Sequence, residues 1–132
     1  MQCPTRPLRR TVAFVDDDAR WLRPQTLVMS QVTSRVDLYP HPLDAVEHIP
    51  RRPPSAVVIG QRMSHVSGLD VARALRSRLG GRCPRLVLLI DDPEALTDEA
   101  RALFDEAHAR PLSAETLVGI LSRAAAGLAR AA

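Results

Sequence analysis

Three short apolar runs without polar alternation constrain the fold of this chain more than any other feature. They span residues 11–15, 55–59 and 85–90 and are rich in β-branched side chains. Strands covered on both faces of a parallel sheet carry such runs, whereas strands with one solvent face alternate apolar with polar residues. The runs therefore predict buried parallel strands, and weaker strands are expected at 35–39 and 107–109.

Helical patterns lie between and after these strands. Five strands alternating with five helices predict an α/β fold, namely a doubly wound parallel sheet with right-handed crossovers. Pro24 falls inside the first helical pattern, where it is expected either to shift the start of the helix or to kink it. The expected helices span 18–31, 43–49, 67–79, 94–105 and 113–129, with candidate N-caps at Asp17, Ser67, Asp92 and Ser113.

The length and composition fit one domain. The chain has 132 residues, of which 45% are hydrophobic and 25% are charged, which suits a single core. Residues 1–10 hold three arginines and no acid, and they account for the whole net charge of +3. We expect a basic flexible arm over 1–10, one domain over 11–129 and a frayed end over 130–132.

Composition also restricts the location and the partners. The two cysteines, Cys3 and Cys83, are far apart, and no apolar run approaches the length of a membrane span, so we expect a cytoplasmic protein without a membrane partner. Only four aromatic residues are present, and we expect no nucleic-acid partner. The chain has no lysine, which excludes chemistry that needs a lysine ammonium.

Polar or unusual residues follow three of the predicted strands, at the edge where sites of doubly wound sheets lie. These segments are Asp16-Asp17-Asp18, the segment from Gly60 to Leu69, and Arg110-Pro111-Leu112-Ser113. Together, in this order and spacing, they resemble the receiver domain of response regulators over about residues 11–128. The resemblance implies a flavodoxin-like (βα)5 sheet with strand order 2-1-3-4-5, with helices one and five on one face and helices two, three and four on the other.

In the receiver family, an acidic pair after the first strand holds Mg²⁺ and an Asp after the third strand accepts a phosphoryl group. A Thr or Ser after the fourth strand, an aromatic residue in the fifth and a Lys before a Pro complete the set. The matching positions in this chain are Asp16 and Asp17 for the acidic pair, Gly60 for the phosphoacceptor, Leu89 or Ile90 for the hydroxyl, Ala107 for the aromatic residue, and Arg110 for the lysine, followed by Pro111, which we expect to be cis.

These departures define a degenerate receiver, or pseudo-receiver. Glycine has no side chain to esterify, so the resemblance implies that Gly60 rules out aspartyl phosphorylation at this site. No other nucleophile follows a strand in a recognisable pattern, and we expect no enzyme activity and no catalytic residue.

The acidic pair leaves two alternatives. In the first, Asp16 and Asp17 retain weak Mg²⁺ binding, although one carboxylate ligand is lost; otherwise no cofactor is expected. Alternatively, Asp17 or Asp18 caps the first helix and Arg110 crosses the emptied pocket to pair with Asp16 or Asp17.

The resemblance implies a stand-alone module that binds a protein partner in two-component or chemosensory-type signalling, independently of phosphorylation. The expected surface is formed by helix four, strand five and helix five, about residues 94–128, and could also support a homodimer. A small-ligand sensor that uses the emptied pocket is the alternative. Apolar candidates for the surface, at least half of which are expected to face the sheet instead, are Leu96, Leu103, Leu117, Leu121 and Leu128.

Overall fold

The computed structural model describes residues 11–31, 35–110 and 112–131. The arm expected at 1–10 and the cis bond expected before Pro111 therefore lie outside the described residues. All strand pairs are parallel and follow the order β2-β1-β3-β4-β5, which confirms the predicted topology. The strands are β1 (Thr11–Val15), β2 (Arg35–Tyr39), β3 (Ala56–Gly60), β4 (Arg85–Ile90) and β5 (Glu106–Ala109).

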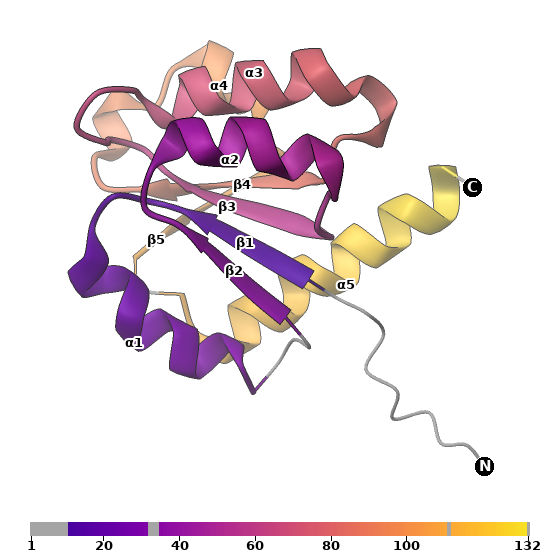
Figure 1. The fold of residues 1–132 in the computed structure, drawn as a ribbon, viewed down its shortest axis with the longest axis horizontal. Coiled ribbons are helices and arrows are strands. Elements are labelled where there is room, and N and C mark those ends of the chain that lie inside the picture. The colour runs from indigo at the N-terminus through magenta and orange to yellow at the C-terminus, as the bar shows by residue number, and fades with distance from the viewer. Residues whose placement is uncertain (1–10, 32–34, 111, 132) are drawn as a thin grey trace.

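The helices form two layers. Helices α1 and α5 cover one face of the sheet, and α2, α3 and α4 cover the other, as expected (Figure 1). The helices are α1 (Ala19–Met29), α2 (Pro42–His48), α3 (Gly68–Leu79), α4 (Asp98–Leu103) and α5 (Ala114–Ala131), and short 3-10 turns occupy Ile49–Arg51, Gly80–Arg82 and Pro93–Ala95. Among the described residues, no helix combines the length and apolar character needed to cross a membrane.

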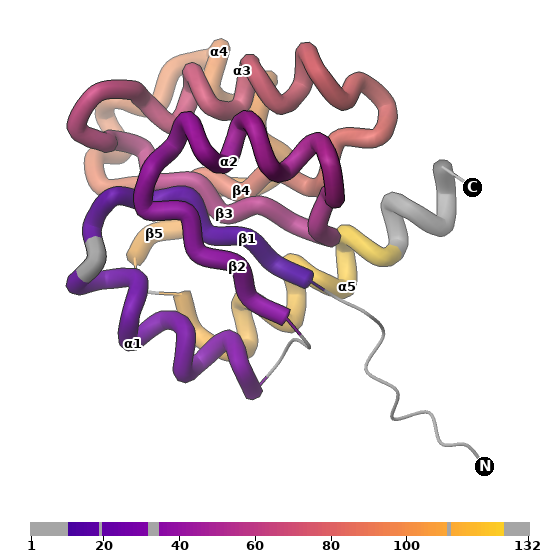
Figure 2. Tube along the Cα trace, in the orientation of Figure 1, coloured from indigo at the N-terminus to yellow at the C-terminus, as the bar shows by residue number. Residues whose placement is uncertain are grey.

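The core has one half on each face of the sheet. Phe14 and Val58 pack with Leu117 of α5 on one face, and Ile59 packs with Leu75 of α3 on the other. All five residues of β3 are buried, which explains why its sequence is uniformly apolar. This core fixes the carboxyl ends of β1, β3 and β4 at one edge of the sheet, on the left in Figure 2.

The fourth helix differs from its prediction over 94–105. Asp92 caps only the 3-10 turn, with its side chain accepting from the backbone N–H of Glu94. The chain is extended at Leu96, and α4 starts after Thr97, whose hydroxyl accepts from the backbone N–H of Ala100. Thr97 followed by two acidic residues is a second helix-start signal, so the expected helix divides into two pieces.

The start of α1 also corrects one prediction. Asp18, and not Asp17, caps the helix by accepting from the backbone N–H of Arg20 at 3.1 Å. The helix begins at Ala19, before Pro24, so the proline does not shift its start. Ser67 and Ser113 do cap their helices, since each hydroxyl accepts a backbone N–H, of Asp70 and Thr116 respectively.

Candidate functional site at the carboxyl edge of the sheet

The sheet brings together three of the singled-out residues. Asp16 follows β1, Gly60 ends β3, and Arg110 follows β5. Asp16 is 1% exposed, an unusual degree of burial for a carboxylate that has no cationic partner.

Arg110 supplies that partner. Its Nη2 lies 2.5 Å from Asp16 Oδ2, and its Nε donates to Asp91 Oδ1 at 2.8 Å. The guanidinium also lies over the Trp21 ring, 4.7 Å from the ring centroid, which adds a cation–π contact. The expected ion pair between Arg110 and Asp16 is thus confirmed.

The space beside Gly60 is filled. A Cβ atom placed on Gly60 would lie 2.8 Å from Asp16 Oδ2 and 3.1 Å from Arg110 Nη2. The first distance is a steric clash, so even the smallest side chain would displace the buried ion pair. The small-ligand alternative needs this volume to be open, whereas Asp16 and Arg110 lie in it.

The two acidic side chains accept hydrogen bonds from the protein itself. Asp16 Oδ1 accepts from the backbone N–H of Asp18 at 3.0 Å. Asp17 Oδ2 accepts from both the backbone N–H and the hydroxyl of Ser64, each at 2.6 Å. Ser64 therefore supplies both of these donors from the loop after β3.

These environments shift the two carboxyl groups in opposite directions. Burial raises the pKa of Asp16, although the Asp18 backbone N–H and the Arg110 guanidinium oppose that effect. The hydrogen bonds from Ser64 lower the pKa of Asp17. The two neighbours therefore do not act as one symmetric pair.

The arrangement does not fit a magnesium ion. Arg110 occupies one side of Asp16, Ser64 engages Asp17, and Gly60 offers no carboxylate. Within residues 11–31, 35–110 and 112–131, no group of three or more Asp, Glu, His or Cys side chains is placed to hold a metal ion. Divalent cations of this kind depend on the number of oxygen ligands.

The positions matched to the switch residues are apolar. Leu89 lies in register with Gly60 and is fully buried, whereas Ile90 is half-buried. Ala107 lies in register with Leu88 and is exposed. Leu89 and Ile90 offer no hydroxyl to a phosphoryl group, and Ala107 has no ring that could move between an inner and an outer position.

The role of Gln61 does not follow from the sequence pattern. Its Oε1 accepts the backbone N–H groups of Asp91 at 2.8 Å and Asp92 at 2.9 Å, and its Nε2 donates to Asp92 O at 3.0 Å. Arg62 adds an ion pair with Asp92 at 3.0 Å. These contacts link the end of β3 to the loop after β4. They depend on the β3–β4 register, which the sequence alone does not give.

Gln25 has a similar role on the other face. It is 4% exposed, its Nε2 donates to Leu112 O at 2.9 Å, and its Oε1 accepts the Leu112 backbone N–H. In the sequence, the only sign of this contact is that Gln25 is a polar residue on an otherwise apolar helix face. This side chain ties α1 to the segment between Arg110 and α5, next to the site.

On the face made by α4, β5 and α5, the expectation that at least half of the apolar candidates face the sheet is confirmed for the described residues. Leu117 and Leu121 are fully buried, Leu96 and Leu103 are half-buried, and the side chain of Leu128 lies outside the described residues. Among the α5 residues whose side chains are described, Val118 is a large apolar residue that is exposed, at 46%. A shallow apolar hollow of about 180 Å³ lies beside Ala107, lined mainly by Leu88, Leu96, Ala100 and Phe104.

No protein-family model matches the sequence, and a search of curated proteins finds no relative. Solved structures do match. The response regulator receiver domain (CheY-like) from Methylobacillus flagellatus superposes with a TM-score of 0.79 at 22% identity, covering 87% of this chain and 98% of that one. The chemotaxis protein CheY4 of Vibrio cholerae gives a TM-score of 0.74 at 18% identity, over 87% and 98% of the two chains.

A longer protein matches through one part. The response regulator DrrB of Thermotoga maritima, an OmpR/PhoB homologue, gives a TM-score of 0.70 at 20% identity, covering 88% of this chain and 52% of that one. These likenesses rest on structure at low sequence identity. The chain has the CheY-like fold of response-regulator receiver domains.

Proposed function

We propose that this chain is a pseudo-receiver that binds a protein partner in two-component or chemosensory-type signalling without being phosphorylated. It has no catalytic role in this proposal. The fold is that of proteins known as response regulators and chemotaxis proteins. We propose that this chain acts in the same kind of signalling but without the phosphorylation step.

One observation carries the proposal: the place of the phosphoacceptor is filled by an ion pair. Gly60 provides no nucleophile, and the volume that an aspartate side chain would need contains Asp16 Oδ2 and Arg110 Nη2. The half-buried Arg110 guanidinium neutralises Asp16 in place of an external cation. Neither a phosphoryl group nor its metal ion has a vacant position here.

A single conformation is the second part of the proposal. The switch positions are apolar, Gln61 fastens the loop after β4, and Arg110 links Asp16 to Asp91 of that same loop. A switch needs two packings of similar free energy. These contacts all favour one packing, so the partner surface is constitutively presented.

The face formed by α4, β5 and α5 is the proposed partner surface. Strand β5 is an edge strand, paired on one side only with β4. The apolar hollow beside the exposed Ala107 provides apolar contact area on this face. A second copy of the chain is an alternative occupant of the same face.

Affinity capture from a lysate of the source organism tests both the independence from phosphorylation and the proposed surface. The immobilised chain should retain the same partner with and without acetyl phosphate, and Ala107→Glu, which places a charge at the hollow on β5, should abolish that retention. Leu27→Glu is the control, because Leu27 is also an exposed apolar residue, at 72%, but lies on α1. Retention that requires acetyl phosphate, or that Leu27→Glu removes and Ala107→Glu does not, contradicts the proposal.

A further inference from the structure

A second site is formed at the opposite end of the sheet, where the strands begin. A cavity of about 440 Å³ opens there between the amino ends of β1, β3 and β4, the turn after α3, and α5. Its volume is within the range of small-molecule sites. Four arginines line it, Arg76, Arg82, Arg85 and Arg123, together with one carboxylate, Asp105.

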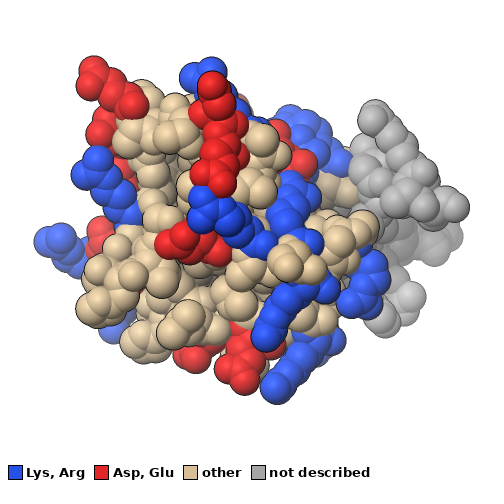
Figure 3. Space-filling model, turned by 90° about the horizontal axis from the view of Figure 1, so that it is seen from above, with Lys and Arg blue, Asp and Glu red and all other residues tan. Residues whose placement is uncertain are grey.

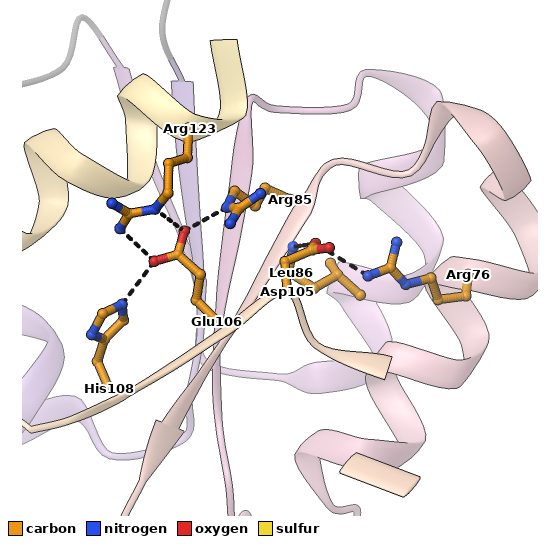
Figure 4. A network of polar contacts seen from close by, with 7 residues as sticks. All are labelled: Arg76, Arg85, Leu86, Asp105, Glu106, His108 and Arg123. Carbon is orange, nitrogen blue, oxygen red and sulfur yellow. Dashed lines mark hydrogen bonds and ion pairs between the residues drawn. The ribbon is translucent and has the colours of Figure 1, made fainter. Parts of the chain in front are cut away.

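Three of these guanidinium groups are held in place by the protein. Glu106 accepts from Arg85 Nε at 2.5 Å, from Arg123 Nε at 2.8 Å and from His108 Nε2 at 2.9 Å. Figure 4 shows Glu106 with these three partners, and Arg76 beside Asp105 to their right. Glu106 is only 10% exposed, so it acts as an internal support for the two arginines.

Arg76 has its own support. Its Nε and Nη2 donate to Leu103 O, and Nη2 also donates to Asp105 Oδ2 at 3.1 Å. Asp105 in turn accepts the backbone N–H of Leu86 at 2.8 Å (Figure 4). The side chains of Arg76 and Arg85 are 32% and 24% exposed, which leaves part of each at the cavity surface.

Arg82 is the free cation of this group. It is exposed on the turn after α3 and makes no hydrogen bond or ion pair with any residue in the described part of the chain. The lining therefore has a surplus of positive charge even after Asp105 and Glu106 are counted against the four arginines. Arginine side chains also gather on the right-hand side of the molecule in Figure 3, over the end of α3.

We infer that this cavity binds a small soluble molecule that carries a phosphate or pyrophosphate group. Guanidinium groups match phosphate oxygens with paired N–H donors, and fixed side chains lose little freedom when a ligand binds. The recessed shape favours a small molecule over a flat polymer or membrane surface. The inference does not rest on the proposed signalling function, because it is argued from the arginines at the amino ends of the strands, although Asp105 lines both this cavity and the hollow beside Ala107.

Titration of the full chain with inorganic pyrophosphate tests the inference. We expect saturable shifts of the arginine Nε–H signals of Arg76, Arg85 and Arg123 in a ¹H–¹⁵N spectrum, at constant ionic strength. Arg82→Ser should weaken binding about tenfold or more, because one charge-assisted contact is lost. Arg23→Ser is the matched control, since it removes an exposed arginine of α1, and it should leave the affinity unchanged.

Three outcomes overturn the inference. The first is the absence of saturable shifts. The second is equal weakening by Arg82→Ser and Arg23→Ser, which indicates general charge attraction. The third is binding to anionic phospholipid vesicles or duplex DNA while free pyrophosphate has no effect, because the ligand is then not a small soluble phosphate.

Discussion

Arg110 joins side chains from three separate elements: Asp16 after β1, Asp91 after β4 and Trp21 in α1. A lysine in its place would offer one ammonium and no planar group to stack on the Trp21 ring. Arginine is therefore the residue type that can contact all three of these side chains at once.

Removing the arginine should be costly. Arg110→Ala leaves the Asp16 carboxylate buried without a cation, and we expect a loss of about 2–4 kcal/mol in the free energy of unfolding. Arg62→Ala is the control, because its pair with Asp92 is largely exposed and should contribute less than about 1 kcal/mol. Urea denaturation of both variants checks this, and equal losses would show that Arg110 has no special role.

Gly60 should not tolerate a side chain. The Cβ of Gly60→Ala would lie 2.8 Å from Asp16 Oδ2, so we expect a loss of about 1–3 kcal/mol, as for other overpacked interiors. Gly81→Ala is a matched control with no atom within 4 Å of its new Cβ, and it should be near neutral. Thermal or urea unfolding distinguishes them; a stable Gly60→Ala variant would mean that the ion pair moves aside easily.

At the scale of elements, the loop after β4 is held by Gln61. Gln61→Ala removes the acceptor for the backbone N–H groups of Asp91 and Asp92, and we expect these two amides to exchange faster with solvent. Gln61→Glu keeps that acceptor and should preserve most of their protection. Hydrogen exchange followed by NMR checks this, and unchanged exchange in Gln61→Ala would show that the loop is ordered by other contacts.

The elements also show what the sequence can predict. The buried strands were predicted because apolar runs such as 55–59 follow directly from burial on both faces. The pairing of Arg110 with Asp16 or Asp17 is one of two alternatives that follow from the convergence of the strand ends, and the structure shows the pair with Asp16. The break before α4 was missed although Thr97 signals it, and the contacts of Gln61 and Ser64 could not be found, because they depend on how loops from different strands pack.

At the scale of the whole molecule, the acidic and basic groups at the two ends of the sheet contribute to stability in a pH-dependent way. Glu106 is the clearest case. Its ion pairs with Arg123 and Arg85 and the hydrogen bond with His108 outweigh burial and lower its pKa from 4.5 to about 2. A carboxyl whose pKa is lowered on folding stabilises the protein above its unfolded pKa and loses that effect as the pH falls through its folded pKa.

Glu106→Gln should remove the part of the pH dependence that comes from Glu106. We expect the wild type to exceed Glu106→Gln by about 3 kcal/mol in the free energy of unfolding near neutral pH, and this difference should shrink between pH 4.5 and about 2. Urea unfolding of both proteins across this range checks the sign. A difference that stays constant with pH would mean that the carboxylate charge does not stabilise the fold.

The most direct test of the proposed function is exposure of the purified chain to acetyl phosphate and beryllofluoride in the presence of Mg²⁺. Intact mass would detect a covalent phosphoryl group, and amide spectra would detect a bound mimic. A receiver domain with an intact phosphoacceptor, treated in parallel, shows that the reagents are active. We predict an unchanged mass and no saturable shifts around Asp16, Gly60 and Arg110, whereas the gain of one phosphoryl group or saturable shifts at these residues would contradict a phosphorylation-independent pseudo-receiver.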